Sequence, residues 1–451
     1  MSLAFAQVPR RSNRFGLANL RRPVWRRQAQ TYFCFLLSAF CFAAARAADT
    51  NTVDLTGKRP FSLNQPPAWT WGGFNFATRA TMGALYDDNI QASPIAPKAD
   101  LKWELAPELY ILGGDTVRDP YGYQSTRVMA ARVNPSYLVT SEPDTWPGAF
   151  VFADYRAQEN VYTRYSEFDG LDHHALVNGV YPLRRLALGL KGNVDVENQT
   201  TAAEGVVVNS VRYGTSVSGG YLLGGRSSIE ATFAQATSTY DDPRLFGSRE
   251  WSLETWLNYL KSDNLSLGVG AGGGWINVFQ DSRFDQTYEH LLLRGIYRTS
   301  ELTDVNATAG VDYRQFNNGA QPAFSPYVAI GGNWRISPQA SVSAQAFYHN
   351  QPSISYGVNY SQAGLSLGGT QKIADNMDVS LSLVYYHINY SATGAQALTQ
   401  LSGDYYGVNA AYGINFTRAL RGNVYYQYYT IGYTTYSYAR NQVGVQVVWG
   451  F

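Results

Sequence analysis

The sequence predicts an all-β fold, a transmembrane antiparallel up-and-down β-barrel of about 18 strands. Three observations favour it: the composition, a period-two hydropathy pattern, and an alternation of short and long connections. The chain has 451 residues, with 42 Gly, 34 Tyr and only 15% charged residues, well below the roughly 25% usual for soluble domains. The aromatic content of 14% excludes intrinsic disorder. Beyond residue 47, no apolar run approaches the ~18 residues that a membrane-spanning helix needs.

The N-terminal segment has the pattern of an export signal. Residues 1–47 hold eight Arg and no acidic residue, and an apolar run from Tyr32 to Ala45 leads into Arg46 and Ala47. This order of basic, apolar and small residues is that of a secretory signal peptide. The alternative, a membrane anchor, is disfavoured because the apolar run is shorter than the ~18 residues that crossing requires. We expect cleavage after Ala47.

The mature chain has no cysteine and a small negative charge. Cys34 and Cys41 both lie in residues 1–47, so neither a disulfide nor a thiolate metal site is expected. Eight of the 35 basic residues lie in that same segment, which leaves 27 against 34 acidic residues. Nucleic acid is not expected as a partner, because its binding needs a clustered basic surface.

Alternation of side chains begins at residue 72. Residues 48–71 contain three Pro and no strong periodicity, which predicts an extended periplasmic segment before a barrel of residues 72–451. The last strand is the clearest case, because Val443 and Val445 share one face while Gln442 and Gly444 share the other. A soluble β-sandwich also alternates, so the period alone does not identify the solvent.

Segment length and connection length favour a membrane barrel over a sandwich. The periodic segments are about 11–16 residues long, whereas ordinary strands have a mode of about 5–6. Outer-membrane barrels have short periplasmic turns, longer external loops and aromatic girdles. Aromatic residues crowd the segment ends, for example at 385–390 and 425–429. The short connections fall near 223–226, 261–264, 335–339 and 417–420, and the longer ones near 241–248, 280–286, 316–324, 351–358 and 391–404.

The strand count follows from the segments and from parity. Two chain ends in the periplasm require an even number of strands. Residues 126–140, interrupted by Pro135, are assigned to an irregular periplasmic connection, and 16 strands is the alternative. The 18 predicted spans are 72–86, 100–112, 148–163, 172–182, 184–198, 209–223, 226–240, 249–261, 264–279, 286–298, 303–315, 325–336, 339–350, 359–372, 377–391, 404–417, 420–431 and 438–451.

A short signature after the first predicted strand carries a family resemblance. The strand runs into Tyr86, Asp87, Asp88, Asn89 and Ile90. This sequence resembles the outer-membrane family named beta-barrel porin 2, as do residues 101–114 and 172–190. The resemblance implies an integral barrel in the outer membrane of a Gram-negative cell, associated with polysaccharide export and its proteins. It implies no catalytic residue.

The C-terminal residues form a candidate signal for barrel assembly. Val447, Trp449 and Phe451 are apolar and occupy alternate positions up to the last residue. A terminal aromatic residue in this pattern resembles the signal read by the barrel assembly machinery. The alternative is an edge strand that happens to end in Phe.

Inward-facing residues are the candidate functional ones. The alternation places twelve residues in the lumen: Lys191, Asp195, Glu197, Arg212, Glu230, Glu254, Arg294, Asp312, Arg314, Tyr425, Gln427 and Tyr429. Their charges are mixed, so strong ion selectivity is not expected. The five His show no zinc-binding spacing, and the adjacent His173 and His174 point to opposite strand faces. No enzyme activity, cofactor or metal is expected.

A barrel of 16–18 strands is wide enough for an aqueous channel unless a segment plugs it. We therefore expect a porin-like channel embedded in outer-membrane lipid that passes polysaccharide or small solutes. The alternative is a structural or adhesive barrel whose external loops bind partners and which has no open pore.

Overall fold

A computed structural model describes most of the barrel region. The described residues are 69–114, 149–183, 185–201, 206–243, 245–300, 303–319, 321–352, 359–391, 402–433 and 437–450. The predicted signal peptide, residues 48–68, the segment 126–140 and Phe451 lie outside them.

Eighteen long strands and one short strand make up the described sheet, so the predicted fold class and strand number are confirmed. The long strands contain 13–17 residues each. The strands are β1 (Trp69–Trp71), β2 (Phe74–Asp87), β3 (Asp100–Gly114), β4 (Phe150–Tyr162), β5 (Gly170–Pro182), β6 (Leu186–Thr201), β7 (Val206–Leu222), β8 (Ser227–Tyr240), β9 (Ser248–Ser262), β10 (Leu265–Val278), β11 (Gln286–Ser300), β12 (Thr303–Phe316), β13 (Ala323–Ser337), β14 (Ala340–Pro352), β15 (Asn359–Ala374), β16 (Met377–Ser391), β17 (Ser402–Asn415), β18 (Leu420–Tyr433) and β19 (Ser437–Gly450).

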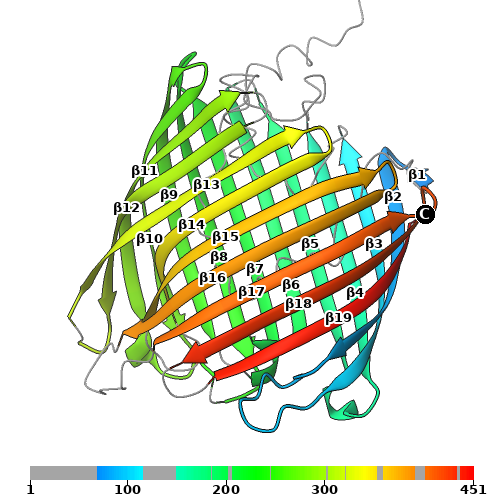
Figure 1. The fold of residues 1–451 in the computed structure, drawn as a ribbon. Helices are drawn as coiled ribbons and strands as arrows, with labels where there is room; N and C mark the ends of the chain where they lie inside the picture. Colours follow the sequence, from blue (N-terminus) through cyan, green and yellow to red (C-terminus); the bar gives the residue numbers. More distant parts are fainter. Residues whose placement is uncertain are drawn as a thin grey trace, which may run out of the picture.

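The sheet closes on itself. Each long strand pairs antiparallel with its neighbour in sequence, and β19 pairs with β2, so that Val443 lies opposite Tyr86. Figure 1 shows the strands as a tilted wall around a central space, with the red C-terminal strand beside the blue N-terminal one. Closure leaves no long free edge, so the backbone N–H and C=O groups of the wall find partners within it.

The short strand β1 extends the closing seam. The paired part of β19 ends at Gly450, opposite Arg79. β1 pairs with Phe74–Phe76, the part of β2 before Arg79. Gly72 and Gly73 both adopt positive φ, 58° and 85°, which glycine tolerates without steric cost in a tight turn. β1 falls within the segment that the sequence predicts to precede the barrel.

The two ends of the barrel differ in their connections. At the end where β2 begins and β19 finishes, seven connections have two to four residues, and the eighth, from β3 to β4, spans 115–149. At the other end, nine connections have three to twelve residues. Outer-membrane barrels place short turns in the periplasm, so the first end is periplasmic and the second external.

Two external connections contain a 3₁₀ turn, η3 (Ser166–Phe168) and η4 (Ser282–Phe284). The Asp281 side chain caps η4 by accepting a hydrogen bond from the Arg283 backbone, and it also accepts one from the Arg283 guanidinium. These bonds hold the pKa of Asp281 below its ordinary value. No helix among the described residues is long and apolar enough to cross a bilayer.

Glycines on β10 make room on the inner face. A Cβ at Gly270 would lie 2.6 Å from the Trp256 ring of β9, closer than van der Waals contact allows. Gly272 and Gly274 leave similar room for His290 and Tyr288 of β11. The run of glycines in β10 thus lets large side chains from both neighbouring strands pack on the inner wall.

Candidate functional site: the inner wall of the barrel

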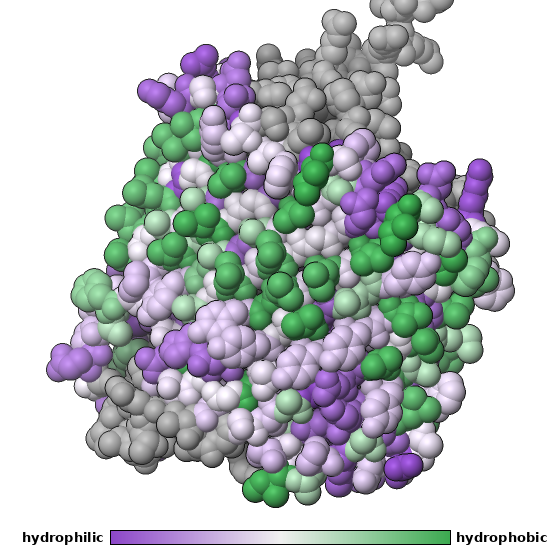
Figure 2. All heavy atoms as spheres, in the orientation of Figure 1, coloured by the Kyte–Doolittle hydropathy of each residue, from purple (hydrophilic) through white to green (hydrophobic). Residues whose placement is uncertain are grey.

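The outer face of the wall is apolar. Alternate residues of β19 project outward, with Val445 52% and Trp449 51% exposed, and Leu291 and Leu293 do the same on β11 at 55% and 58%. Figure 2 shows hydrophobic side chains spread across the outer face of the barrel in that view. A monomeric soluble protein rarely exposes an apolar surface of this extent. A closed antiparallel sheet with an apolar outside is the form in which strands cross lipid.

The chain is an outer-membrane β-barrel. Its lipid-facing wall contributes no chemistry of its own, so the functional residues are sought on the inner face. On this face polar and charged side chains are buried against one another.

One polar cluster lies across β8, β9 and β11. Arg294 donates hydrogen bonds to both carboxylate oxygens of Glu230, at 2.9 and 3.0 Å, and to Asn258 Oδ1. The Arg294 guanidinium also lies 4.3 Å from the centre of the Trp256 ring. Trp256 Nε1 donates to Glu254 Oε1 at 2.6 Å. The structure therefore brings together three of the predicted lumen residues, Glu230, Glu254 and Arg294.

A second cluster lies on β11 and β12, nearer the external end. Arg314 forms a two-pronged ion pair with Asp312, its Nε and Nη2 each lying 3.0 Å from a carboxylate oxygen. It also donates to Gln286 Oε1 and to the Asn350 carbonyl. The guanidinium lies 5.1 Å from the Tyr288 ring centre. Both charged residues are almost fully buried, and each satisfies the other's charge.

Three further arginine–carboxylate pairs were not among the predicted lumen residues. Arg79 binds Glu108, Arg421 binds Asp378 and Arg440 binds Asp87. In each pair the carboxylate lies on a different strand from its arginine, at a sequence separation of 29, 43 or 353 residues. Alternation gives the face of each residue but not the partner across the sheet.

The remaining charged candidates lie on β6 and β7. Asp195 stands opposite Arg212 in the β6–β7 register and opposite His174 in the β5–β6 register. Glu197 follows two residues later on the same face of β6. Lys191 lies close enough to interact with the charge of Asp195. These residues are partly exposed, in contrast to the buried arginine pairs.

Tyr425, Gln427 and Tyr429 project inward from β18, on the face opposite the exposed Val424 and Tyr426. Tyr429 belongs to a group that we call the tyrosine cluster. It consists of Ala92, Tyr360, Val384, Tyr386, Ile388, Tyr390, Tyr405, Tyr429, Ile431 and Tyr438.

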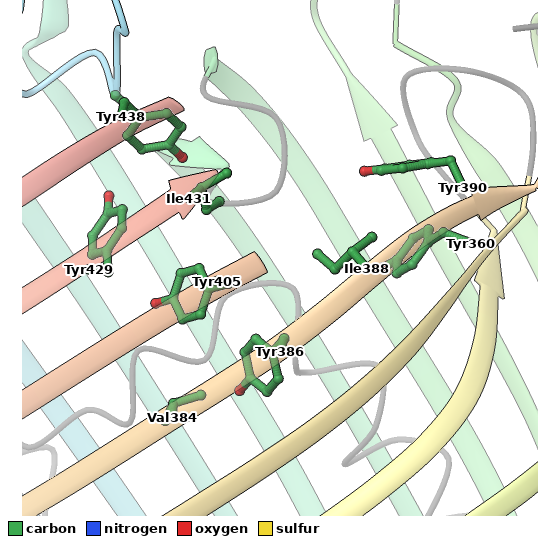
Figure 3. Packing of buried hydrophobic residues seen from close by; sticks show 10 residues of the cluster. Tyr360, Val384, Tyr386, Ile388, Tyr390, Tyr405, Tyr429, Ile431 and Tyr438 are labelled. Carbon is green, nitrogen blue, oxygen red and sulfur yellow. The ribbon is translucent and has the colours of Figure 1, made fainter. Parts of the chain in front are cut away.

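Figure 3 shows these side chains along β15–β19. Tyr386 stacks on Tyr405 with ring centres 5.3 Å apart, and Tyr405 stacks on Tyr429 at 5.9 Å. The crowding of aromatic residues at 385–390 predicts a girdle at the lipid headgroups. That prediction is wrong for Tyr386 and Tyr390, which are buried on the inner face, because alternation turns every second residue of each strand inward.

The signature residues meet the tyrosine cluster at the external end of the seam. Asp87 is 2% exposed and binds the Arg440 guanidinium, which also donates to the Tyr429 hydroxyl at 2.6 Å. Asp88 accepts hydrogen bonds from the backbone and side chain of Asn441. The Asn89 amide donates to the Ala439 carbonyl at 3.1 Å.

These contacts tie the end of β2 to the start of β19. Ile90 is buried, whereas Tyr86 faces outward. The geometry therefore gives the signature a structural role in closing the barrel. Alternation alone could not reveal it, because its partners lie about 350 residues away.

The adjacent histidines face opposite sides of β5, as alternation predicts. The Tyr155 hydroxyl and His173 Nδ1 lie 2.9 Å apart on the outer face. His174 Nδ1 lies 3.1 Å from Asp195 Oδ1 on the inner face. Val447 and Trp449 of the predicted assembly signal project into lipid. Recognition by the assembly machinery stays a prediction.

No protein-family model and no curated protein matches this sequence. The resemblance carried by Tyr86–Ile90 therefore stays a prediction. Solved structures with a similar fold include the outer-membrane channel DcaP of Acinetobacter baumannii, with 14% identity, 86% of this chain and 100% of that chain covered, and a TM-score of 0.42.

OccAB4 of the same organism is 10% identical; the match covers 86% of this chain and 100% of OccAB4, with a TM-score of 0.44. OpdL of Pseudomonas aeruginosa is 9% identical; the match covers 84% of this chain and 99% of OpdL, with a TM-score of 0.45. All three TM-scores lie below 0.5, and no solute, partner or assembly follows from them for this chain.

Proposed function

We propose that the barrel acts as a porin-like passive channel across the outer membrane. The observation that supports this most directly is the contrast between the two faces of a closed 18-strand wall, apolar outside and polar inside. Barrels of 16–18 strands enclose a space wide enough for water and solutes.

Weak discrimination between cations and anions follows from the charges of the wall. Five inward arginines each bind a carboxylate: Arg79, Arg294, Arg314, Arg421 and Arg440. A neutralised pair contributes little field along the channel, whereas rings of one sign create selectivity. We therefore propose that the solutes are polar and mostly uncharged.

Carbohydrate chains are the solute class that the tyrosine cluster favours. Sugars present apolar C–H faces together with many hydroxyl groups, and a Tyr side chain offers an apolar ring and a hydroxyl. Gln427 and Asn409 lie inward on β18 and β17, opposite one another in register, and add amide donors and acceptors. Polysaccharide secretion through this barrel, with export proteins as partners, is the form of the proposal that the family resemblance favours.

Single-channel recording in planar lipid bilayers tests the channel. Purified, folded protein is expected to produce discrete current steps under an applied voltage. In a KCl gradient, the reversal potential should lie near zero, because the channel discriminates weakly between K⁺ and Cl⁻. Folded barrel that inserts without producing steps would contradict the channel and favour a structural or adhesive barrel with partner-binding external loops.

Current block by neutral oligosaccharides tests the solute class. The wild-type current is expected to fall as oligosaccharide is added, and Tyr429→Ala is expected to weaken the block severalfold. Tyr426→Ala on the lipid-facing side of the same strand is the matched control and should behave as wild type. Equal block in all three proteins would count against carbohydrate recognition by the tyrosine cluster while leaving the channel intact.

A further inference from the structure

A group of metal-ligand side chains lies on the inner wall away from the tyrosine cluster. His174 of β5 and Asp195 and Glu197 of β6 each offer one ligand atom, and these atoms lie within 4.8 Å of one another. His174 Nδ1 is 3.1 Å from Asp195 Oδ1 and 3.8 Å from Glu197 Oε1. We call this group the His174 cluster.

The strand register creates this cluster. His174 and Asp195 are direct cross-strand partners, and Glu197 follows Asp195 by two residues on the same face. The three side chains therefore converge without any loop, from positions near the external half of both strands. Their side chains are 21%, 32% and 16% exposed, so an ion in the lumen reaches them.

The partners of these carboxylates differ from those of the five arginine-bound acids of the inner wall. Glu108, Glu230, Asp312, Asp378 and Asp87 each bind an arginine at hydrogen-bond distance. Asp195 and Glu197 instead face an imidazole, and Asp195 also accepts a hydrogen bond from Asn193. The imidazole supplies a ligand nitrogen beside two carboxylates that could also serve as ligands.

The donor set selects a class of ion. One imidazole nitrogen and two carboxylate oxygens suit Zn²⁺ and its transition-metal neighbours, whereas Ca²⁺ and Mg²⁺ prefer oxygen alone. In a tetrahedral Zn²⁺ site, ligand atoms lie about 3.3 Å apart, since each is about 2.0–2.2 Å from the ion. Side-chain rotation would bring the three donors to that spacing, and water would complete the coordination.

Two flanking cations oppose binding. Arg212 and Lys191 lie close enough to interact with the charge of Asp195. Repulsion between these cations and a divalent ion lowers the affinity. The affinity for the ion is thus expected to lie in the micromolar range, and removing the charge of Arg212 should raise it.

We propose that the His174 cluster is a lumen-facing site for a divalent transition-metal ion of the Zn²⁺ type. A bound ion would join β5 to β6 on the external half of the inner wall. The site does not depend on whether the barrel conducts solutes.

Zn²⁺ titration of purified barrel in detergent, by isothermal calorimetry or equilibrium dialysis, tests the site. The protein carries no histidine tag, and folding of each variant is checked by its heat-dependent migration on gels. Wild type is expected to bind a single Zn²⁺ in the lumen. Loss of a ligand in His174→Ala or Glu197→Gln should weaken binding by about tenfold or more.

Two further variants separate metal ligation from general damage. His173→Ala removes the neighbouring imidazole on the outer face and should bind Zn²⁺ as wild type does. Arg212→Gln removes a competing cation and should tighten binding by roughly threefold. The proposal is overturned if folded wild type binds no Zn²⁺ at millimolar concentration, or if His174→Ala and Glu197→Gln bind as well as wild type.

Discussion

Arginine–carboxylate pairs hold single residues of the inner wall in place. Arg294 donates from one nitrogen to both oxygens of Glu230, and Arg314 donates from two nitrogens, one to each oxygen of Asp312. Removing one partner of a buried pair leaves an uncompensated charge, at a cost of about 3–5 kcal/mol. These pairs therefore fix the shape of the wall as well as its electrostatic neutrality.

Asp312→Asn is expected to make the channel prefer anions. The change leaves the buried Arg314 guanidinium without its counter-charge, so the inner wall gains a net positive charge there. The reversal potential in a KCl gradient should shift toward the chloride potential. The double variant Asp312→Asn/Arg314→Gln removes both charges and should restore the wild-type value, and a single variant with unchanged reversal potential would contradict the prediction.

The sequence predicts which face of the wall each residue lies on, but not which residues it contacts. Period-two alternation is enough to place Glu230, Arg294 and Tyr429 on the inner face. Their contacts depend on strand register, which joins Glu230 to Arg294 across 64 residues. The His174 cluster could not be predicted for the same reason, because two adjacent strands must align before an imidazole meets two carboxylates.

At the scale of the strand, the glycines of β10 make room for packing on the inner wall. Large inward side chains from β9 and β11 occupy the space that β10 leaves empty, as Trp256 does over Gly270. Overpacking such a site typically costs about 1–3 kcal/mol.

Gly270→Val is expected to destabilise the barrel by about 1–3 kcal/mol, because the new side chain would overlap the Trp256 ring. The temperature at which the folded form disappears on unheated gels should fall. Ala271→Val is the matched control, since residue 271 faces lipid on the same strand. If both variants lost the same stability, the strand's β-propensity rather than inner-face packing would be responsible.

The strands themselves were predictable nearly to their ends. Each of the 18 predicted spans overlaps its strand, as with 377–391 for β16 and 286–298 for β11, because lipid on one side and polar groups on the other impose strict alternation. β1 was missed, since a three-residue strand of Trp69–Trp71 is too short to show a period.

At the scale of the whole molecule, the apolar outer face requires lipid. Leu293 projects outward from the middle of β11 and is 58% exposed. A Lys at the bilayer midplane costs about 2–4 kcal/mol, and less near the interface.

Leu293→Lys is therefore expected to lower the free energy of unfolding in phospholipid vesicles by about 2–4 kcal/mol. Urea titration of the vesicle-embedded protein measures it. Tyr297→Lys, four residues nearer the periplasmic end of β11, should cost less. A soluble protein would instead tolerate both changes equally, and that result would refute burial of this face in lipid.

The bond between Asp87 and Arg440 spans 353 residues and has a consequence for biogenesis. The first long strand carries a carboxylate whose counter-ion is synthesised last. A chain that ends before residue 437 lacks both β19 and the guanidinium that pairs with Asp87, so we expect its sheet to stay open. An open sheet leaves unpaired strand edges, and we expect such truncated molecules to be degraded by proteases.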